Sequence, residues 1–164
     1  MSKTKKLVTL SLLAAVALAL FTVELLIPPI TPFPWVKIGL ANIITLFVLY
    51  RKEYTAYNAL SVVIVRVLLA GLITGSPISL LFSFTGGVAS LLAMVGLRKL
   101  APTIPATITS VAGALTHNLA QIIVAVFVYG GFGVLLYLPG LVLGGIISGL
   151  ITGFAIAIIL RRMA

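Results

Sequence analysis

Residues 46–82, LFVLYRKEYTAYNALSVVIVRVLLAGLITGSPISLLF, hold the pattern that decides the fold. Arg51 and Lys52 occupy the hydrophilic gap after one apolar run, whereas the next gap, Gly75-Ser76, contains no Arg or Lys. Membrane proteins collect Arg and Lys in their cytoplasmic loops. The two gaps are therefore predicted to lie on opposite sides of a membrane, with the apolar run between them crossing it.

The same alternation continues along the chain. The gaps after the first, third and fifth apolar runs hold no Arg or Lys until Lys37, at the edge of the second run. The remaining gaps and the two ends hold the other loop cations: Lys3, Lys5, Lys6, Arg98, Lys99, Arg161 and Arg162. This pattern predicts six crossings with both termini in the cytoplasm.

The composition agrees with a membrane protein, because 62% hydrophobic and 8% charged residues could not cover a soluble surface. We predict an all-α polytopic protein in which residues 1–164 form a single transmembrane domain. A crossing helix needs about 20 apolar residues, so the second of the six predicted spans is short. These spans cover residues 7–27, 36–50, 54–74, 77–97, 104–129 and 138–160.

The net charge of +9 comes mainly from the cytoplasmic loop cations, so it indicates contact with anionic membrane lipid rather than with nucleic acid. Cysteine is absent, which excludes disulfides and cysteine-based metal sites. The chain also has no Walker A loop and no aspartate, and therefore lacks the aspartate-rich magnesium sites that hold diphosphates. We expect no metal site, no cofactor and no catalytic residue.

Four ionisable residues fall inside the predicted spans: Glu24, Lys37, Arg66 and His117. At a helix rise of about 1.5 Å per residue, Arg66 lies about 18 Å and His117 about 20 Å from the cytoplasmic side. Glu24 and Lys37 lie near the outer ends of their spans. A charge at mid-bilayer costs at least about 2.5–3.5 kcal/mol, so it is normally paired or lines a wet cavity.

Several interpretations of these residues remain open. Glu24 either pairs with Arg66 and ties two helices together, or meets a cationic part of a solute. Lys37 either extends to the outer headgroups or stands at the rim of a site. His117 is the sole histidine, which makes a metal-ligand role unfavourable.

Polar side chains accompany His117 on the fifth span, where Thr116, His117, Asn118 and Gln121 lie within six residues. His117 and Gln121 are four residues apart and share a helix face. They indicate either hydrogen bonds between helices or a lined pocket, and we favour the pocket. The predicted solute-binding residues are Arg66, His117, Asn118, Gln121 and Asn42, with Lys37 at the rim and Glu24 beside Arg66. Their surplus positive charge favours an anionic solute.

Small residues form two further patterns. Gly140, Gly144, Gly145, Gly149 and Gly153 follow a small-xxx-small spacing on the last span, which predicts close helix packing. Ala15 and Ala19 give the first span a slim surface. That surface serves either for packing inside the bundle or for docking to another membrane protein.

Four segments resemble the Gx transporter family, whose members are labelled heptaprenyl diphosphate synthase component I. They are KIGLANIITLFVLY at 37–50, SFTGGVASLLAM at 83–94, GALTHNLAQI at 113–122 and YLPGLVLGGIISGLITG at 137–153. The family in turn is similar to the substrate-binding S components of energy-coupling factor (ECF) importers. This resemblance implies a six-helix membrane protein that binds a small solute and docks on a transmembrane coupling protein carrying two ATPases.

In that group, alanines of the first helix contact the coupling protein, so the resemblance implies this role for Ala15 and Ala19. It also implies a bacterial or archaeal cytoplasmic membrane. The component I label implies an alternative, a membrane subunit of an enzyme that makes isoprenoid side chains for menaquinone. Because the chain lacks residues for that chemistry, the alternative would be a non-catalytic partner, and the importer subunit is our main prediction.

Overall fold

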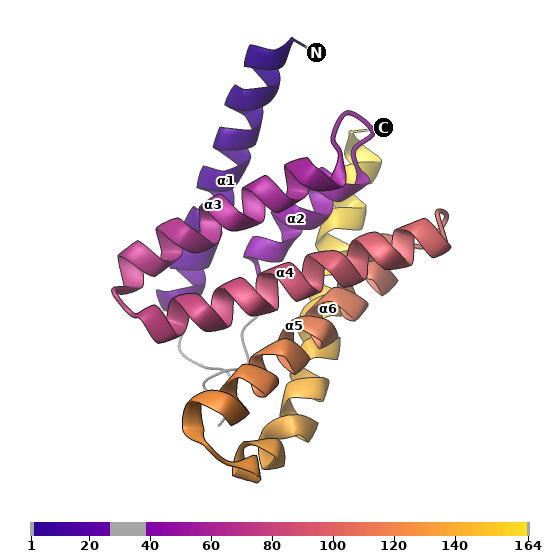
Figure 1. Cartoon of the computed structure of the whole chain (residues 1–164). Helices are drawn as coiled ribbons and strands as arrows, with labels where there is room; N and C mark the ends of the chain where they lie inside the picture. The colour runs from indigo at the N-terminus through magenta and orange to yellow at the C-terminus, as the bar shows by residue number, and fades with distance from the viewer. Residues whose placement is uncertain (1, 27–38, 164) are drawn as a thin grey trace.

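The computed structural model describes residues 2–26 and 39–163, and within these ranges all regular secondary structure is helical (Figure 1). The predicted all-α class is therefore confirmed. The helices are α1 (Lys3–Leu26), α2 (Ala41–Tyr50), α3 (Ala56–Thr74), α4 (Pro77–Leu100), α5 (Ala106–Tyr129), the 3₁₀ helix η1 (Phe132–Tyr137) and α6 (Leu138–Arg162).

Five helical segments are long and apolar enough to cross a membrane: α1, α3, α4, α5 and the continuous segment formed by η1 and α6. They make the chain a multi-pass membrane protein. The helix in the predicted second span is shorter than expected, since α2 has 10 residues and begins at Ala41. Residues 36–38 lie outside the described residues, so the sixth crossing stays a prediction.

Local sequence explains where α3 ends and α4 begins. Gly75 adopts a φ of 62°, a left-handed conformation that glycine enters without steric cost, and its N–H closes the last turn of α3. The Ser76 hydroxyl then accepts a hydrogen bond of 3.2 Å from the N–H of Ser79, with Pro77 in the first turn of α4. A serine cap followed by proline is a favoured helix start, and the predicted boundary between the spans 54–74 and 77–97 is confirmed.

Helix α5 packs between α4 and α6, while α1 packs against α2 and α3 (Figure 1). Helices α5 and α6 make the most extensive contact among the described helices. A Cβ atom added at Gly149 would lie 2.6 Å from the Cα of Val111, and one added at Gly153 would lie 2.5 Å from the Cα of Thr107. Both glycines thus allow the two backbones to approach, which confirms the close packing predicted for these two positions of the last span.

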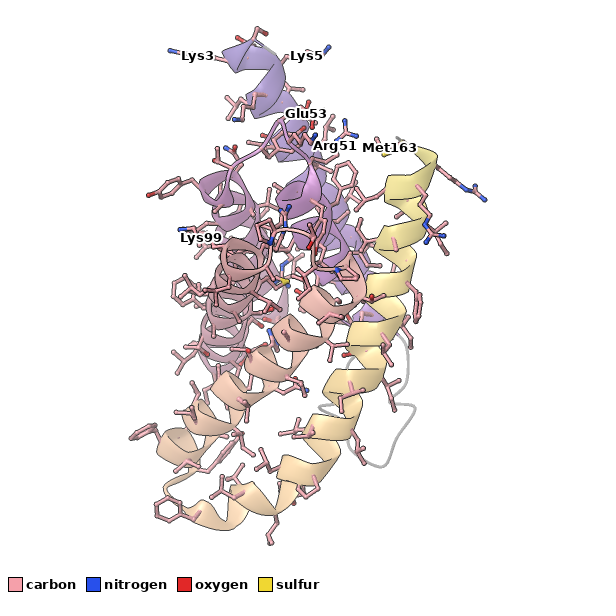
Figure 2. The ribbon with its side chains drawn as sticks, turned by 90° about the vertical axis from the view of Figure 1, so that its right-hand side faces the viewer. Lys3, Lys5, Arg51, Glu53, Lys99 and Met163 are labelled. Carbon is pink, nitrogen blue, oxygen red and sulfur yellow. The ribbon has the colours of Figure 1, made fainter. Side chains whose placement is uncertain are left out.

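The loop cations gather in one half of the bundle, together with both termini (Figures 1 and 2). We call this the basic end; it includes Lys3, Lys5, Arg51 and Lys99 (Figure 2). The pKa of Glu53 is held below its usual value, first by a hydrogen bond from the backbone of Glu53 and then by the guanidinium of Arg51, which lies 2.6 Å away. The clustering agrees with the predicted placement of these loops on one side of the membrane.

The solid part of the core lies toward the basic end. Its fully buried members include Leu46, Val63, Met94 and Ile156, from four different helices. Here the hydroxyl of Tyr50 hydrogen-bonds to the carbonyl oxygen of Ile104 at 3.0 Å and to the hydroxyl of Thr109 at 2.7 Å. The guanidinium of Arg98 stacks 4.1 Å from the centre of the Tyr50 ring and donates to the carbonyl of Leu49, at the last turn of α2. These bonds join α2, α4 and α5 in this half of the bundle.

Candidate functional site

The other half of the bundle is hollow. A cavity of about 650 Å³ lies between the helices there. The described residues that line it are Phe21, Glu24, Gly39, Ala41, Asn42, Arg66, Ser76, Ile78, Ser79, Phe82, Ser83, Ala114, His117, Asn118, Gln121, Ile122, Ala125, Tyr129, Val134, Tyr137, Leu141 and Ser148.

The up-and-down course of the chain explains why these residues meet. Consecutive helices run in opposite directions, so the end of α1, the start of α2, the end of α5 and the start of α6 share one end of the bundle (Figure 1). Every lining residue from α1 and α4 comes from the half of its helix that points away from the basic end, and those from α5 extend from Ala114, in its first half, to Tyr129 at its far end. Under the predicted topology, the cavity therefore faces the outside.

Arg66 lies in the middle of α3 and is 6% exposed. Its Nε atom is buried and has no hydrogen-bond partner among the described residues. Gly87 on α4 faces it: a Cβ atom added there would lie 3.6 Å from Nη2. The guanidinium is thus a buried charge with an unused donor at the wall of the cavity, an arrangement that is costly unless something compensates it.

Glu24 is engaged elsewhere. Its Oε1 accepts a hydrogen bond of 2.5 Å from the N–H of Gly39, and its Oε2 accepts one of 3.2 Å from the N–H of Leu40. The carboxylate thereby stands at the N-terminus of α2, where the helix dipole favours a negative charge. No nitrogen of Arg66 lies within 4 Å of it in the described structure. The ion pair that we considered between Glu24 and Arg66 is therefore not formed directly, although both side chains line one cavity.

His117 and Asn118 are held by contacts across helix interfaces. The ring of His117 fills the space beside Gly86 of α4, where an added Cβ atom would lie 2.7–2.9 Å from the ring. The Nδ2 of Asn118 donates a hydrogen bond of 2.7 Å to the carbonyl oxygen of Leu141 on α6. Since that partner can only accept, Nδ2 is the donor, and the amide oxygen Oδ1 is the group that Asn118 has left to offer.

The structure brings together most of the predicted solute-binding residues. Arg66, His117, Asn118, Gln121, Asn42 and Glu24 all line the cavity. Lys37 lies outside the described residues. Thr116, the neighbour of His117, is not among the lining residues, because its hydroxyl donates a hydrogen bond of 2.8 Å to the carbonyl oxygen of Ala112 in the preceding turn.

Sequence reasoning missed two groups of lining residues. The first is aromatic and includes Phe21, Phe82, Tyr129 and Tyr137. Nothing distinguishes such residues from the lipid-facing aromatics of so apolar a chain. The second is a hydroxyl stripe on α4, formed by Ser76, Ser79 and Ser83. Their spacing of three and four residues places them on one helix face, a signal that the sequence did contain.

The surface of α1 divides its alanines into two sets. Ala14 and Ala17 are buried at 3% and 1% exposure, whereas Ala15 and Ala19 are exposed. Packing inside this chain therefore does not account for Ala15 and Ala19. Separately, the described residues contain no group of three side chains suited to holding a metal ion.

Comparisons with known proteins give a family and a fold. The profile of a family described as heptaprenyl diphosphate synthase component I matches residues 13–159. The solved structure of the S component of a bacterial ECF transporter has a similar fold, with a TM-score of 0.76 and 20% sequence identity, over 99% of this chain and 96% of that chain. A comparison with curated protein sequences gives no match.

Proposed function

This chain belongs to the heptaprenyl diphosphate synthase component I family, and from its cavity and fold we propose that it is the substrate-binding membrane subunit of an ECF-type importer. The substrate is a small solute, and the buried guanidinium of Arg66 favours an anionic one. The observation that carries the proposal is the cavity of about 650 Å³ at the end opposite the loop cations. That volume is within the usual range for small-molecule sites, about 300–1,000 Å³.

In this proposal the chain binds and does not catalyse. Its polar side chains, among them Arg66, His117 and Gln121, surround a space, and the described residues contain no group suited to holding a metal ion. The energy for import then comes from partners, namely a transmembrane coupling protein and two ATPases. The membrane is the cytoplasmic membrane of a bacterium or archaeon, with the cavity facing outward and both termini in the cytoplasm.

The exposed alanines of α1, Ala15 and Ala19, supply the docking surface for the coupling protein. Both lie on the surface of the bundle, and small side chains there let a partner helix approach closely. A bulky side chain at either position would hold that helix away without entering the cavity, because neither alanine lines it.

Co-purification tests the proposal. The full chain, co-expressed with a coupling protein and its two ATPases, should form a stable complex, and Ala15→Trp or Ala19→Trp should disrupt it. Leu92→Trp is the matched control, since Leu92 on α4 is 65% exposed on the surface of the bundle. If the wild-type chain forms no complex, or if Ala15→Trp assembles as well as Leu92→Trp, the proposed role is wrong.

The family description favours a second candidate, a non-catalytic membrane partner of a prenyl diphosphate synthase. This role predicts that the purified chain changes the rate or the product length of a soluble prenyl synthase. An unchanged rate and an unchanged product distribution in the presence of excess chain would together exclude it.

A further inference from the structure

The charges around the cavity set the chemistry of its ligand. Among the described lining residues, Arg66 carries the sole permanent positive charge and Glu24 is the sole carboxylate. Both oxygens of Glu24 are occupied by backbone N–H groups at the start of α2. Glu24 is thus already stabilised by its own partners and makes no direct contact with the guanidinium.

Arg66 is left with hydrogen-bonding capacity, and no carboxylate of the described residues forms an ion pair with it. Its side chain is buried to more than nine-tenths, and its Nε donor has no partner in the described structure. A guanidinium presents a planar set of donors that matches a carboxylate or another oxyanion with two parallel hydrogen bonds. A ligand that brings one oxyanion to Arg66 would satisfy this donor and compensate the buried charge.

The remainder of the wall is suited to an apolar body. Four aromatic residues from four helices line this space: Phe21 on α1, Phe82 on α4, Tyr129 on α5 and Tyr137 on η1. Along α5 the lining extends from Ala114 to Tyr129, a distance of about 22 Å at the rise of an α-helix. Arg66 lies in the middle of its helix, whereas Tyr129 ends α5, so the charged group lies deeper in the bundle than the Tyr129 side chain.

From this arrangement we infer that the cavity takes an amphipathic organic monoanion, with its carboxylate on Arg66 and an aromatic or isoprenoid body against the aromatic side chains. The inference rests on the proposed function and names its substrate class. It also predicts that the cavity does not favour a diphosphate as its ligand. A diphosphate carries several negative charges, and the described wall offers one cation to meet them.

A series of probes with one common body tests this assignment. Geranic acid, geraniol, geranyl monophosphate and geranyl diphosphate share a chain and differ in their head group. Each is titrated by calorimetry into the full chain in neutral-lipid nanodiscs. Geranic acid should bind about 10- to 100-fold more tightly than geraniol, which is the factor that hydrogen bonds to a charged group contribute. Acetate has the same carboxylate head group but no apolar body, and it should bind at least about 10-fold more weakly than geranic acid.

Substitutions then assign the head group to Arg66. Arg66→Gln should remove the advantage of geranic acid over geraniol and leave geraniol binding unchanged. Arg66→Lys should restore part of it, because a lysine keeps the charge and loses the planar pair of donors. Arg51→Gln is the matched control: Arg51 pairs with Glu53 in the loop between α2 and α3 and should not affect any probe.

Each opposing result overturns the inference. These results are equal binding of acid and alcohol, tighter binding of the diphosphate than of the acid, unchanged acid binding in Arg66→Gln, or no binding of any probe. Failure here is distinguishable from failure of the importer role. A chain that assembles with the coupling module but ignores the head group is an importer subunit for another substrate class. A chain that binds geranic acid through Arg66 but forms no complex retains the site and loses the proposed role.

Discussion

Replacing Gly149 with alanine tests whether the α5–α6 contact determines the stability of the bundle. The new Cβ atom would lie 2.6 Å from the Cα and 2.9 Å from the backbone nitrogen of Val111. Carbon atoms in contact are normally about 3.5–4.0 Å apart, so the helices must separate locally by about 1 Å. The obstructing atoms belong to the backbone, and no rotation of a side chain can relieve the overlap.

The size of the effect follows from two opposing contributions. Overpacking of a tight contact costs about 1–3 kcal/mol. Replacing a helical glycine with alanine returns about 0.5–1 kcal/mol through backbone entropy. Gly96→Ala on α4 receives the same entropic gain without the overlap, because an added Cβ atom there meets nothing within 4 Å. The difference between the two variants should therefore be about 1–3 kcal/mol, with Gly149→Ala the less stable.

Reversible unfolding in mixed micelles, followed by helical circular dichroism, measures this difference. The comparison with Gly96→Ala removes the contribution of helix propensity, which is common to both variants. If Gly149→Ala is as stable as Gly96→Ala, the close approach of α5 and α6 does not stabilise the bundle, and the argument from the glycine spacing is refuted.

Three further predictions concern other contacts. Gly86→Ala should displace the ring of His117, because the added Cβ atom would lie 2.7 Å from it; His117 is the sole histidine, so its ring resonances in NMR spectra report the change directly, and unchanged resonances would contradict the contact. Glu24→Gln should weaken the start of α2 by about 0.5–2 kcal/mol, with faster hydrogen exchange of the first amides of that helix, and unaltered exchange would show that the carboxylate does not hold them. Tyr50→Phe should cost about 1–3 kcal/mol in unfolding free energy, because it removes two hydrogen bonds worth about 0.5–1.5 kcal/mol each, whereas Tyr57→Phe, at a side chain 81% exposed, should cost nothing measurable.

Local rules were sufficient for most helix boundaries. The end of α3 and the start of α4 depend on Gly75, Ser76 and Pro77, which act through their own backbone preferences and are visible in the sequence. The start of α2 was not predictable in this way. It depends on Glu24, which lies 15 and 16 residues before the amides that it accepts from, so the boundary is set by a tertiary contact.

The residues of the candidate site likewise include some that the sequence could identify and some that only the tertiary structure reveals. Arg66, His117 and Gln121 could be selected from sequence because polar groups in an apolar helix need a reason to be there. The aromatic lining residues could not be selected, because a phenylalanine such as Phe82 looks the same in the sequence whether its side chain faces a cavity or lipid. The complementarity of His117 and Gly86 also escaped prediction, because it joins two helices at positions 31 residues apart in the sequence.

The arrangement of large and small residues explains how one bundle combines a solid half and a hollow half. On α3, Val62, Val63 and Val67 are fully buried, and Arg66 lies between them in the sequence. The valines pack in the core beside the basic end, and the guanidinium extends from the same helix to the cavity wall. The floor of the cavity is therefore the surface of the packed core that faces away from the basic end. A ligand at Arg66 rests on a part of the protein held by buried contacts, so a substitution that loosens this core should weaken binding even though it touches no ligand. Val67→Ala, which removes buried volume one residue from Arg66, tests this: it should lower both stability and geranic acid affinity, and a loss of stability with unchanged affinity would show that the site does not depend on the core beneath it.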